Sequence, residues 1–361
     1  MSLPKLLLLG GNWCENIRGS GYINKFYTAL KSLGNFDIKF QNGGTKEELL
    51  LYFQQLQEFS VVIWMANVPN TFDDKMVDKI KTQNQNIILV TSKNNLENKY
   101  HYMQLISRML ATKSNLELVF TKNTSGQIAG TVIDPLNNAF CLEETEISKV
   151  SSTLATRILQ LLSYSRMGSR QIGEAKEIPN NEQFFNIAKH YAEIFHNIIH
   201  PENTSRFLGN LSFRCENGFP SFKQDNIIYV TRRNVDKRLI GKEGFVAIDA
   251  NVTDCVCYYG EHKPSVDSPT LVQLYNYYVN VAYTIHSHVY IEGAPFTKHR
   301  IPCGALEEVD AVIEIISDKT TKNFAVNLLG HGSIVFANGL EFISRQKYIT
   351  RQCPEVCCNA E

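Results

Sequence analysis

The feature that most constrains the fold is an alternation, in the first half of the chain, of short strand-like runs with amphipathic helical windows. The expected strands cover residues 5–9, 36–40, 61–65, 87–90 and 116–120, and the helices between them cover residues 23–33, 46–56, 74–81 and 102–110. A βαβ series predicts a parallel sheet with helices on both faces. A short β pair around residues 128–133 and a helix over residues 151–163 complete a Rossmann-like or flavodoxin-like three-layer domain.

The second half follows a different pattern, because one long helical window over residues 182–199 leads into a strand-rich region. Strands are expected at residues 227–230, 244–248, 255–259, 282–290, 311–316 and 324–329, with helices at residues 270–281 and around Glu307. This predicts an α+β or layered α/β/α domain. Linker-like composition from residue 166 to residue 181 places the expected boundary near residue 175, which gives domains at 1–175 and 176–361.

Composition limits the partners that the protein can have. The chain has 361 residues, 43% of them hydrophobic, which is enough for two independent cores. Lys+Arg and Asp+Glu both number 36, so the net charge does not indicate binding to nucleic acid or to an anionic membrane. No apolar run approaches the roughly eighteen residues that span a bilayer, and residues 6–9 are too short for a signal-peptide core. We therefore expect a cytoplasmic protein with a small-molecule or protein partner.

The segment Ile285-His286-Ser287-His288 indicates a metal site. Two histidines two residues apart on a strand project from the same face and can bind one ion. His331 follows the apolar run 324–329 on a tight turn, and Asp267 lies just before a helical stretch that leads back to the histidine strand. Three imidazoles and one acid form a divalent-metal set. The alternative is a pair of strand histidines whose hydrogen bonds are satisfied within the core.

Four motifs in order give the second half a resemblance to a known family. They are Gly209-Asn210-Leu211-Ser212, then Val230-Thr231 ahead of residues 244–249, then the segment from Lys263 to Pro269, and finally His286-Ser287-His288 with Gly330-His331-Gly332. Over about residues 182–343 the chain resembles the class II aldolase and adducin-head family, which includes fuculose-phosphate aldolase, rhamnulose-phosphate aldolase and ribulose-phosphate 4-epimerase. The resemblance implies a class II aldolase-like α/β/α fold.

The resemblance also implies a metal centre. By position, His286, His288 and His331 would be zinc ligands, and Asp267 would be the active-site acid. Most aldolases of this kind have Glu at the acid position and use it as a metal ligand or general base, whereas the epimerase branch has Asp. The shorter acid favours ligation slightly. Zn²⁺ or another divalent metal is the implied cofactor.

A phosphate site is implied at a second group of positions. Asn210, Thr231 and Ser265 match residues that hold the substrate phosphate in the family. The sequence departs from the family where Arg232-Arg233 replaces a small Ser-Gly pair and where Val266 replaces the second of two serines. Arginine forms bidentate bonds to phosphate or carboxylate, so either Arg232 or Arg233 can preserve an anion site. The alternative is that both side chains are solvated or fill the pocket.

These observations favour a zinc-dependent lyase that cleaves or forms a C–C bond in a small phosphorylated or anionic hydroxy-carbonyl compound such as a sugar phosphate. Epimerisation is less supported, because the segment 295–303 replaces a longer Gly-rich loop and holds no aspartate that matches the second acid of the epimerase. A non-catalytic, adducin-like binding or scaffold role is the alternative from a different class. Family members generally form tetramers, so a homo-oligomer is expected.

Two further features have competing interpretations. Gly10-Gly11-Asn12 follows the first expected strand, and Arg18-Gly19-Ser20-Gly21 precedes the first helix, so this loop either binds a phosphate or is simply a turn. Cys255 and Cys257 are two of nine cysteines, for which free thiols are the default in the cytoplasm. This C-x-C pair either forms a second metal or redox site or alternates along a half-buried strand.

Overall fold

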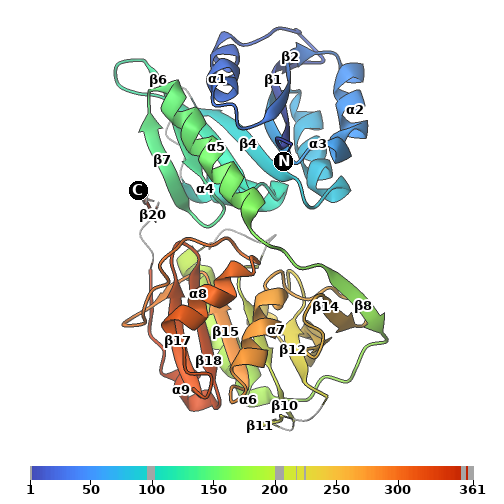
Figure 1. The fold of residues 1–361 in the computed structure, drawn as a ribbon, viewed down its shortest axis with the longest axis vertical. Coiled ribbons are helices and arrows are strands. Elements are labelled where there is room, and N and C mark those ends of the chain that lie inside the picture. The colour runs from blue at the N-terminus through green and yellow to red at the C-terminus, as the bar shows by residue number, and fades with distance from the viewer. Residues whose placement is uncertain are drawn as a thin grey trace. The chain divides into compact units, whose positions relative to one another are not determined.

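The computed structural model describes residues 2–95, 102–199, 207–216, 218–222, 225–350 and 355–356. The chain forms two compact units, Met1–Ser163 with Gln352–Glu361 and Tyr164–Arg351 (Figure 1). This division falls earlier than the boundary near residue 175 that the linker composition suggested. The physical reason is that β8 (Ser169–Gly173) pairs with β14 (Val256–Tyr259) and so belongs to the second sheet.

The first unit contains one large mixed sheet in the order β2-β1-β3-β4-β5-β6-β7-β20. Its strands are β1 (Lys5–Trp13), β2 (Asp37–Gly44), β3 (Val61–Asn67), β4 (Ile88–Asn95), β5 (Leu116–Lys122), β6 (Ile128–Ile133), β7 (Asn138–Glu144) and β20 (Glu355–Val356). Its helices are α1 (Gly21–Ser32), α2 (Lys46–Gln54), the 3₁₀ turn η1 (Leu56–Glu58), α3 (Asn70–Gln83), α4 (Tyr102–Thr112) and α5 (Ile147–Ser163). Strands β1 to β5 are parallel, which confirms the predicted parallel-sheet fold.

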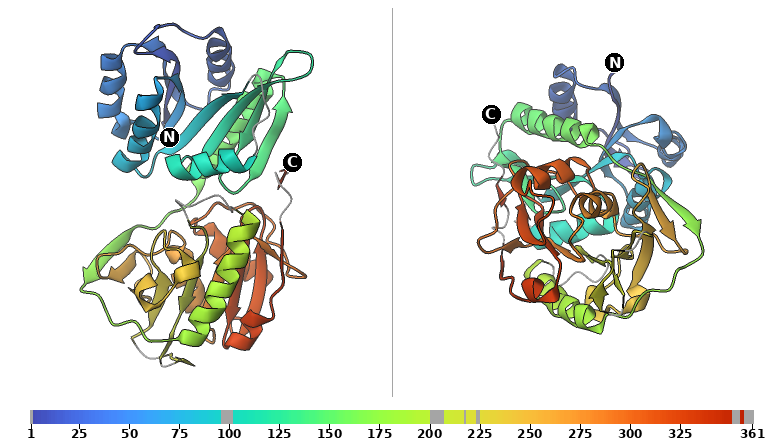
Figure 2. Two further views of the ribbon diagram at one scale, coloured as in Figure 1. Left: turned by 180° about the vertical axis from the view of Figure 1, so that it is seen from behind. Right: turned by 60° about the horizontal axis from the view of Figure 1, so that its bottom comes forward.

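Both faces of this sheet are covered by helices. Along β1, Leu6 and Leu8 pack in a core with α1 and α5, whereas Leu7 and Leu9 pack in a second core with α2 and α3. This two-sided burial explains why the run is apolar at every position rather than at alternate positions. The two covered faces can be compared in Figure 1 and in the reversed view of Figure 2.

The second unit is built on a sheet in the order β17-β18-β15-β9-β12-β13-β14-β8, antiparallel except for the β14–β8 pair. Its other strands are β9 (Asn210–Phe213), β10 (Cys215–Glu216), β11 (Phe219–Pro220), β12 (Ile227–Thr231), β13 (Phe245–Asp249), β15 (Tyr283–Ser287), β16 (Tyr290–Ile291), β17 (Asn323–Leu328), β18 (Gly332–Ala337) and β19 (Tyr348–Ile349). Its helices are α6 (Glu182–Ile199), α7 (Ser268–Tyr277), α8 (Glu307–Ile315) and α9 (Leu340–Ser344), with 3₁₀ turns η2 (Lys237–Leu239) and η3 (Lys242–Gly244).

The second sheet also lies between two layers of helices. Leu274 of α7 and Val312 of α8 pack with Ile228 and Phe336 on one face. On the other face, α6 and α9 pack against β9 and β15 in a core rich in aromatic rings. The layered α/β/α arrangement predicted for the second half is therefore confirmed.

One expected strand of the second half is wrong. Residues 311–316 lie in and just after α8, although Val312, Ile313, Ile315 and Ile316 suggested a strand. The three acids in the first turn of α8 favour a helix start, and burial of Val309 and Val312, three residues apart, is the helical period. The single strand expected over residues 282–290 is divided between β15 and β16.

Candidate metal centre

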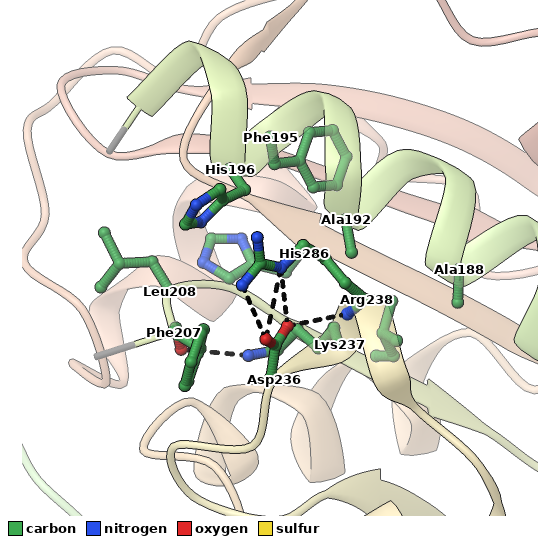
Figure 3. A pocket seen from close by; sticks show the side chains of 11 residues that line it. Ala188, Ala192, Phe195, His196, Phe207, Leu208, Asp236, Lys237, Arg238 and His286 are labelled. Carbon is green, nitrogen blue, oxygen red and sulfur yellow. Dashed lines mark hydrogen bonds and ion pairs between the residues drawn. The ribbon is translucent and has the colours of Figure 1, made fainter. Parts of the chain in front are cut away.

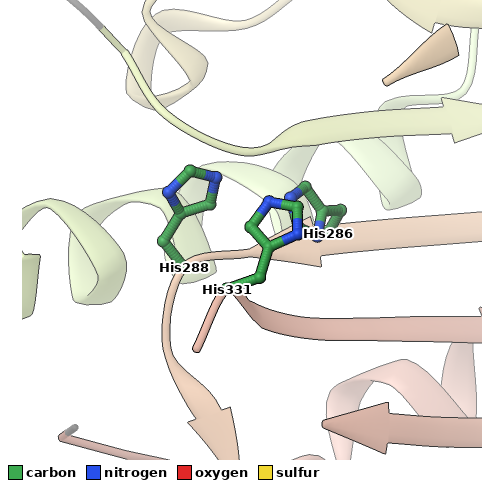
Figure 4. A group of neighbouring side chains, drawn as sticks. All are labelled: His286, His288 and His331. Carbon is green, nitrogen blue, oxygen red and sulfur yellow. The ribbon is translucent and has the colours of Figure 1, made fainter. Parts of the chain in front are cut away.

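The histidine segment and the Gly-His-Gly turn lie on adjacent strands. β15 pairs antiparallel with β18, so that His286 is opposite Ile334 and Ser287 is opposite Ser333. His288 follows directly after β15, and His331 lies in the turn between β17 and β18, where Gly330 has a φ of 70° that favours glycine. The two imidazoles of the His286–His288 segment thus face the imidazole of His331, which lies more than 40 residues further along the chain (Figure 4).

The three histidines form a compact buried group. Their ring centroids are 4.7 Å apart for His286 and His331, 5.1 Å for His288 and His331, and 5.2 Å for His286 and His288. Their side chains are almost fully buried, and one ring nitrogen from each lies within 4.8 Å of the other two. This arrangement suits a divalent metal ion that prefers nitrogen ligands, such as zinc.

Hydrogen bonds orient two of these rings. His286 Nδ1–H donates to the Ser333 carbonyl at 2.9 Å, and His331 Nδ1–H donates to Glu308 Oε2 at 2.7 Å. In each ring the lone pair then lies on Nε2, the arrangement typical of metal-binding histidines. The buried Nε2 of His286 has no hydrogen-bond partner among the described residues, so the residues present fit a metal ion.

Burial also favours the ligand form of His286. It lowers the pKa of this imidazole, and the neighbouring His331 lowers it further. The ring is therefore neutral near pH 7, as a metal ligand must be.

Asp267 lies beside the histidines, at the start of α7. Its Oδ2 accepts a hydrogen bond from Asn210 Nδ2 at 2.8 Å and lies 3.9 Å from His286 Nε2. Burial opposes ionisation of this carboxyl, but the positive charge that His286 and His331 carry when they are protonated at acid pH, with hydrogen bonds from Cys303 and Asn210, outweighs burial and lowers the pKa. The predicted acid is thus a carboxylate within reach of the histidine group.

Asn210 reaches this group because β9 lies next to β15. It is directly opposite His286 in the antiparallel register and is fully buried. Its Nδ2 donates to Asp267, while its Oδ1 is buried with no hydrogen-bond partner among the described residues. The amide therefore positions Asp267 and retains one acceptor for another group.

The other residues expected to bind phosphate lie around the end of β12. Thr231 is buried, and its Oγ1 accepts a hydrogen bond from the Leu211 backbone at 3.3 Å. The Ser265 backbone N–H donates to the Thr231 carbonyl at 3.0 Å, which brings the Ser265 segment beside this strand end. Arg232 is half-buried and Arg233 is exposed. Within the part of the chain that the structure describes, no hydrogen bond or ion pair joins either guanidinium to the histidine group.

Sequence reasoning missed two residues of the site. Glu308 comes from the first turn of α8, and Cys303 comes from the loop before it, where Sγ–H donates to Asp267 Oδ1 at 2.7 Å. Burial raises the pKa of the Cys303 thiol well above its usual value, and the Asp267 charge raises it further. No spacing rule connects either residue to His331, because the contacts are made only when α8 packs on the sheet.

A narrow pocket borders His286 on the side of α6 (Figure 3). Its apolar wall includes Phe195 and Leu208, and its polar wall includes Lys237. Burial lowers the pKa of Lys237 to about 8, and its Nζ donates to the Phe207 carbonyl at 3.0 Å. A buried amine near Asp267 was not anticipated from the sequence.

The first-unit loop is held by its own hydrogen bonds. Gly11 has a φ of 71°, the Asn12 backbone N–H donates to the Arg18 carbonyl, and Asn42 Oδ1 accepts from the Ser20 backbone at 2.9 Å. A polar pocket lies at the carboxyl end of β1, as expected for a doubly wound sheet. Phosphate binding there stays a prediction.

The Cys255 and Cys257 pair does not alternate along a strand as one interpretation expected, because β14 begins at Val256 and both Val256 and Cys257 are buried. Both are free thiols, with Cys257 buried in β14 and Cys255 half-buried just before it. Neither belongs to a group of metal-ligand type among the described residues.

Comparison with known proteins supports the resemblance. Residues 189–294 match the family model of the Class II Aldolase and Adducin N-terminal domain. A search of curated proteins gave no match. Among the helices that the structure describes, none is long and apolar enough to cross a membrane.

Solved structures similar to parts of this chain include two aldolases and a flavoprotein. An L-fuculose 1-phosphate aldolase has 16% identity and a TM-score of 0.33, covering 47% of this chain and 82% of its own. The L-fuculose 1-phosphate aldolase from Glaciozyma antarctica PI12 has 12% identity and a TM-score of 0.32, covering 48% and 76%. The DNA/pantothenate metabolism flavoprotein from Streptococcus pneumoniae has 13% identity and a TM-score of 0.37, covering 45% and 100%.

Proposed function

Because residues 189–294 match the class II aldolase and adducin family, we propose that the second unit is a metal-dependent lyase of the class II aldolase type. It cleaves or forms a carbon–carbon bond in a small phosphorylated or otherwise anionic hydroxy-carbonyl compound. The observation that carries the proposal is the convergence of His286, His288 and His331 on one buried point beside Asp267. The core packing alone requires no imidazole at these positions.

The donor set favours zinc, because neutral imidazole nitrogens are among its preferred ligands. When bound, the metal supplies the Lewis acidity that stabilises negative charge on the substrate carbonyl as the carbon–carbon bond breaks. The protein holds the ring of His286 through Ser333 and the ring of His331 through Glu308, so that both nitrogens are oriented in advance.

Asp267 either accepts the substrate hydroxyl proton or is a metal ligand together with the three histidines. Retro-aldol cleavage needs a base for the substrate hydroxyl proton and an acid for the resulting carbanion. The Asp267 carboxylate is fixed by Asn210, and its lowered pKa keeps it ionised at neutral pH. It can therefore accept the hydroxyl proton, or it would serve as a further ligand of the metal ion.

The substrate anion is assigned to the end of β12. Asn210, Thr231 and Ser265 supply polar groups, and Arg232 or Arg233 supplies the positive charge that the family provides by other means. The support for this part is that the Ser265 segment lies against Thr231 through a backbone hydrogen bond. A planar guanidinium there matches a phosphate or a carboxylate through paired hydrogen bonds.

The proposal also covers location and assembly. The protein is cytoplasmic and homo-oligomeric, and it binds neither nucleic acid nor a membrane. Its balanced charge, with 36 basic and 36 acidic residues, supports the last point. Light scattering coupled to size-exclusion chromatography tests the oligomer, since a mass of one 41.0 kDa chain would contradict it.

An aldehyde-release screen tests the lyase. Wild type and His286→Ala are incubated with a panel of sugar phosphates and related hydroxy acids, and released aldehyde is measured by coupled reduction. We expect release by wild type and a loss on the order of 100-fold or more in His286→Ala, because the charge-stabilising group is removed. His299→Ala, which changes an exposed loop histidine, is the matched control and retains the activity. Equal traces of wild type and His286→Ala across the panel would instead favour an adducin-like binding role.

A further inference from the structure

A buried lysine without an ion pair lies in the pocket beside the histidine group. Lys237, at the start of the 3₁₀ turn η2, is 7% exposed. Its Nζ donates to the Phe207 carbonyl at 3.0 Å and to the Val235 carbonyl at 3.3 Å. Within the part of the chain that the structure describes, no carboxylate forms an ion pair with it. An ammonium has three N–H groups, so one stays available for a further acceptor.

Lys237 carries a positive charge that its neighbours compensate only from a distance. Burial lowers its pKa to about 8, while Asp267 and Asp236 act in the opposite direction, so the amine is mostly protonated at pH 7. Asp236 is paired with Arg238, whose Nη2–H donates to Oδ2 at 2.8 Å. Lysine is seldom buried without an anion that balances its charge, because removing an ammonium from water is costly. The buried ammonium therefore indicates an anion that is not part of the chain.

The pocket at Lys237 also borders the proposed metal centre (Figure 3). Ala192 and Phe195 of α6 and Leu211 of β9 form apolar parts of its wall. His286 lines the same pocket, so a small molecule in it can contact the ammonium and approach the histidine group. The apolar wall excludes water, which strengthens a charge-assisted hydrogen bond from Lys237.

The chain holds Lys237 in place before any ligand binds. The Phe207 backbone N–H donates to Asn234 Oδ1 at 2.9 Å, and the Phe207 carbonyl accepts from Lys237. The Asp236 carboxylate accepts from the Arg238 backbone N–H at 3.0 Å and so closes the turn. These contacts orient the ammonium in advance, which reduces the entropy lost on binding.

We infer that Lys237 binds a carboxylate of the substrate, so that the substrate of the proposed lyase is a hydroxy-carbonyl compound that is also a carboxylic acid. The inference rests on the proposed function for the reaction, whereas the carboxylate site itself depends only on the pocket. One ammonium balances the single charge of a carboxylate, but a phosphate monoester carries about −1.5 to −2 at pH 7.

The carboxylate site is distinct from the proposed phosphate site. Thr231, Arg232 and Ser265 at the end of β12 are not among the described residues that line the pocket at Lys237. The inference therefore holds for a substrate with or without a phosphate at its other end.

Binding calorimetry with small probes tests the inference. Zinc-loaded wild type, Lys237→Met and Lys242→Met are each titrated with pyruvate, with its neutral amide pyruvamide and with inorganic phosphate. We expect the Kd of pyruvate to rise by about 10- to 100-fold in Lys237→Met, because a hydrogen bond between charged groups is lost. Lys242→Met, which changes an exposed lysine in the next 3₁₀ turn, is the matched control and binds pyruvate as wild type does.

A comparison of the two probes within wild type does not depend on a variant. Pyruvamide has the shape of pyruvate without its charge, so we expect it to bind at least about 10-fold more weakly. The comparison is repeated on chelator-treated wild type, where no metal ion attracts the carboxylate, and the same order of affinities is expected. A thermal melt checks that Lys237→Met is folded, and if it is not, this comparison decides. Equal affinities of chelator-treated wild type for the two probes, or no binding of pyruvate, would overturn the inference.

The remaining outcomes distinguish this inference from the proposed function. Equal pyruvate affinity in wild type and folded Lys237→Met, or Lys237-dependent binding of phosphate but not of pyruvate, would overturn the carboxylate site. Binding of pyruvate through Lys237 without aldehyde release in the activity screen would overturn the lyase and keep the carboxylate site.

Discussion

At the scale of single residues, Glu308 controls how His331 presents its nitrogen. The carboxylate and the imidazole are both buried, and the Nδ1–H donates to Oε2 at 2.7 Å. A carboxylate behind a ligating histidine fixes the ring and raises its basicity. Glu308 would therefore be a positioning residue of the proposed metal centre, acting through His331.

The change Glu308→Gln tests this role. We expect zinc affinity to fall by about 10- to 100-fold, the usual effect of removing such a partner. Competition with a chromophoric chelator measures the affinity. Asp310→Asn, which alters an exposed acid on the same helix, is the control and leaves the affinity unchanged. An unchanged affinity in Glu308→Gln would show that the ion pair has no part in metal binding.

The pair formed by Asp236 and Arg238 should make the stability of the folded state depend on pH. Arg238 lowers the pKa of Asp236 by hydrogen bonding to it, with Nη2 to Oδ2 at 2.8 Å. The Asp236 carboxyl has a lower pKa in the folded state than in the unfolded state, so its ionised form stabilises the fold. This stabilisation is complete above the unfolded-state pKa of about 3.9 and is lost as the pH falls through the folded-state pKa.

For Asp236→Asn we therefore expect a loss of about 1 kcal/mol or less at pH 7, since the pair is partly exposed. The loss should shrink as the pH is lowered from 5 toward 3. Urea unfolding across this range gives the free energies, with Asp254→Asn, an exposed acid before β14, as the control. A difference that is the same at every pH would contradict the prediction.

At the scale of elements, the site depends on how closely β18 approaches the end of β15. Gly332 has a φ of 156°, and a Cβ there would lie 1.9 Å from the Ser287 carbonyl oxygen and 2.6 Å from His288 Cα. No side chain fits without moving one strand. This glycine therefore keeps His331 against the histidine segment.

Gly332→Ala should separate the two ligand segments. We expect loss of stoichiometric zinc binding and a lower melting temperature, both measured on the purified variant. Gly339→Ala is a matched control, because a Cβ at that position meets nothing within 4 Å, and it should behave as wild type. Full zinc binding by Gly332→Ala would show that the contact is not needed.

Helices and strands differ in how well the sequence alone predicts them. Strong periodicity and two-sided burial made β1, β3 and α6 predictable, since each pattern is local. A helix was expected around Glu307, where α8 begins, but residues 311–316 were mistaken for a strand because β-branched residues dominate that window. The buried contacts of Val309 and Val312 that favour the longer helix come from distant elements. Propensity is a weak guide where such packing decides.

At the scale of the whole molecule, two units have separate cores and only the second carries the histidine group. The histidines and Asp267 were predictable because their order along the chain follows a family pattern. Cys303 and Glu308 were not, because they reach the site through the fold of one loop and the docking of α8. The tail strand β20 joins β7 of the first unit, which no local pattern indicated.

Zinc binding should raise the thermal stability of the protein only when the three-histidine site is intact. With zinc at 100 times its dissociation constant, the native state gains about 2.7 kcal/mol by mass action. Differential scanning calorimetry with and without zinc should therefore show a raised transition in wild type and none in His331→Ala. The comparison uses the zinc-dependent increment, so any loss of stability from the substitution itself cancels. An equal increment in both proteins would mean that zinc binds elsewhere.

We propose above all that three buried imidazoles bind one metal ion. The most direct measurement is the metal content of freshly purified protein by inductively coupled plasma mass spectrometry, for wild type, His331→Ala and His299→Ala. We expect about one zinc ion per chain in wild type and in His299→Ala, and almost none in His331→Ala. Wild-type protein without stoichiometric metal, or equal zinc in His331→Ala, would contradict it.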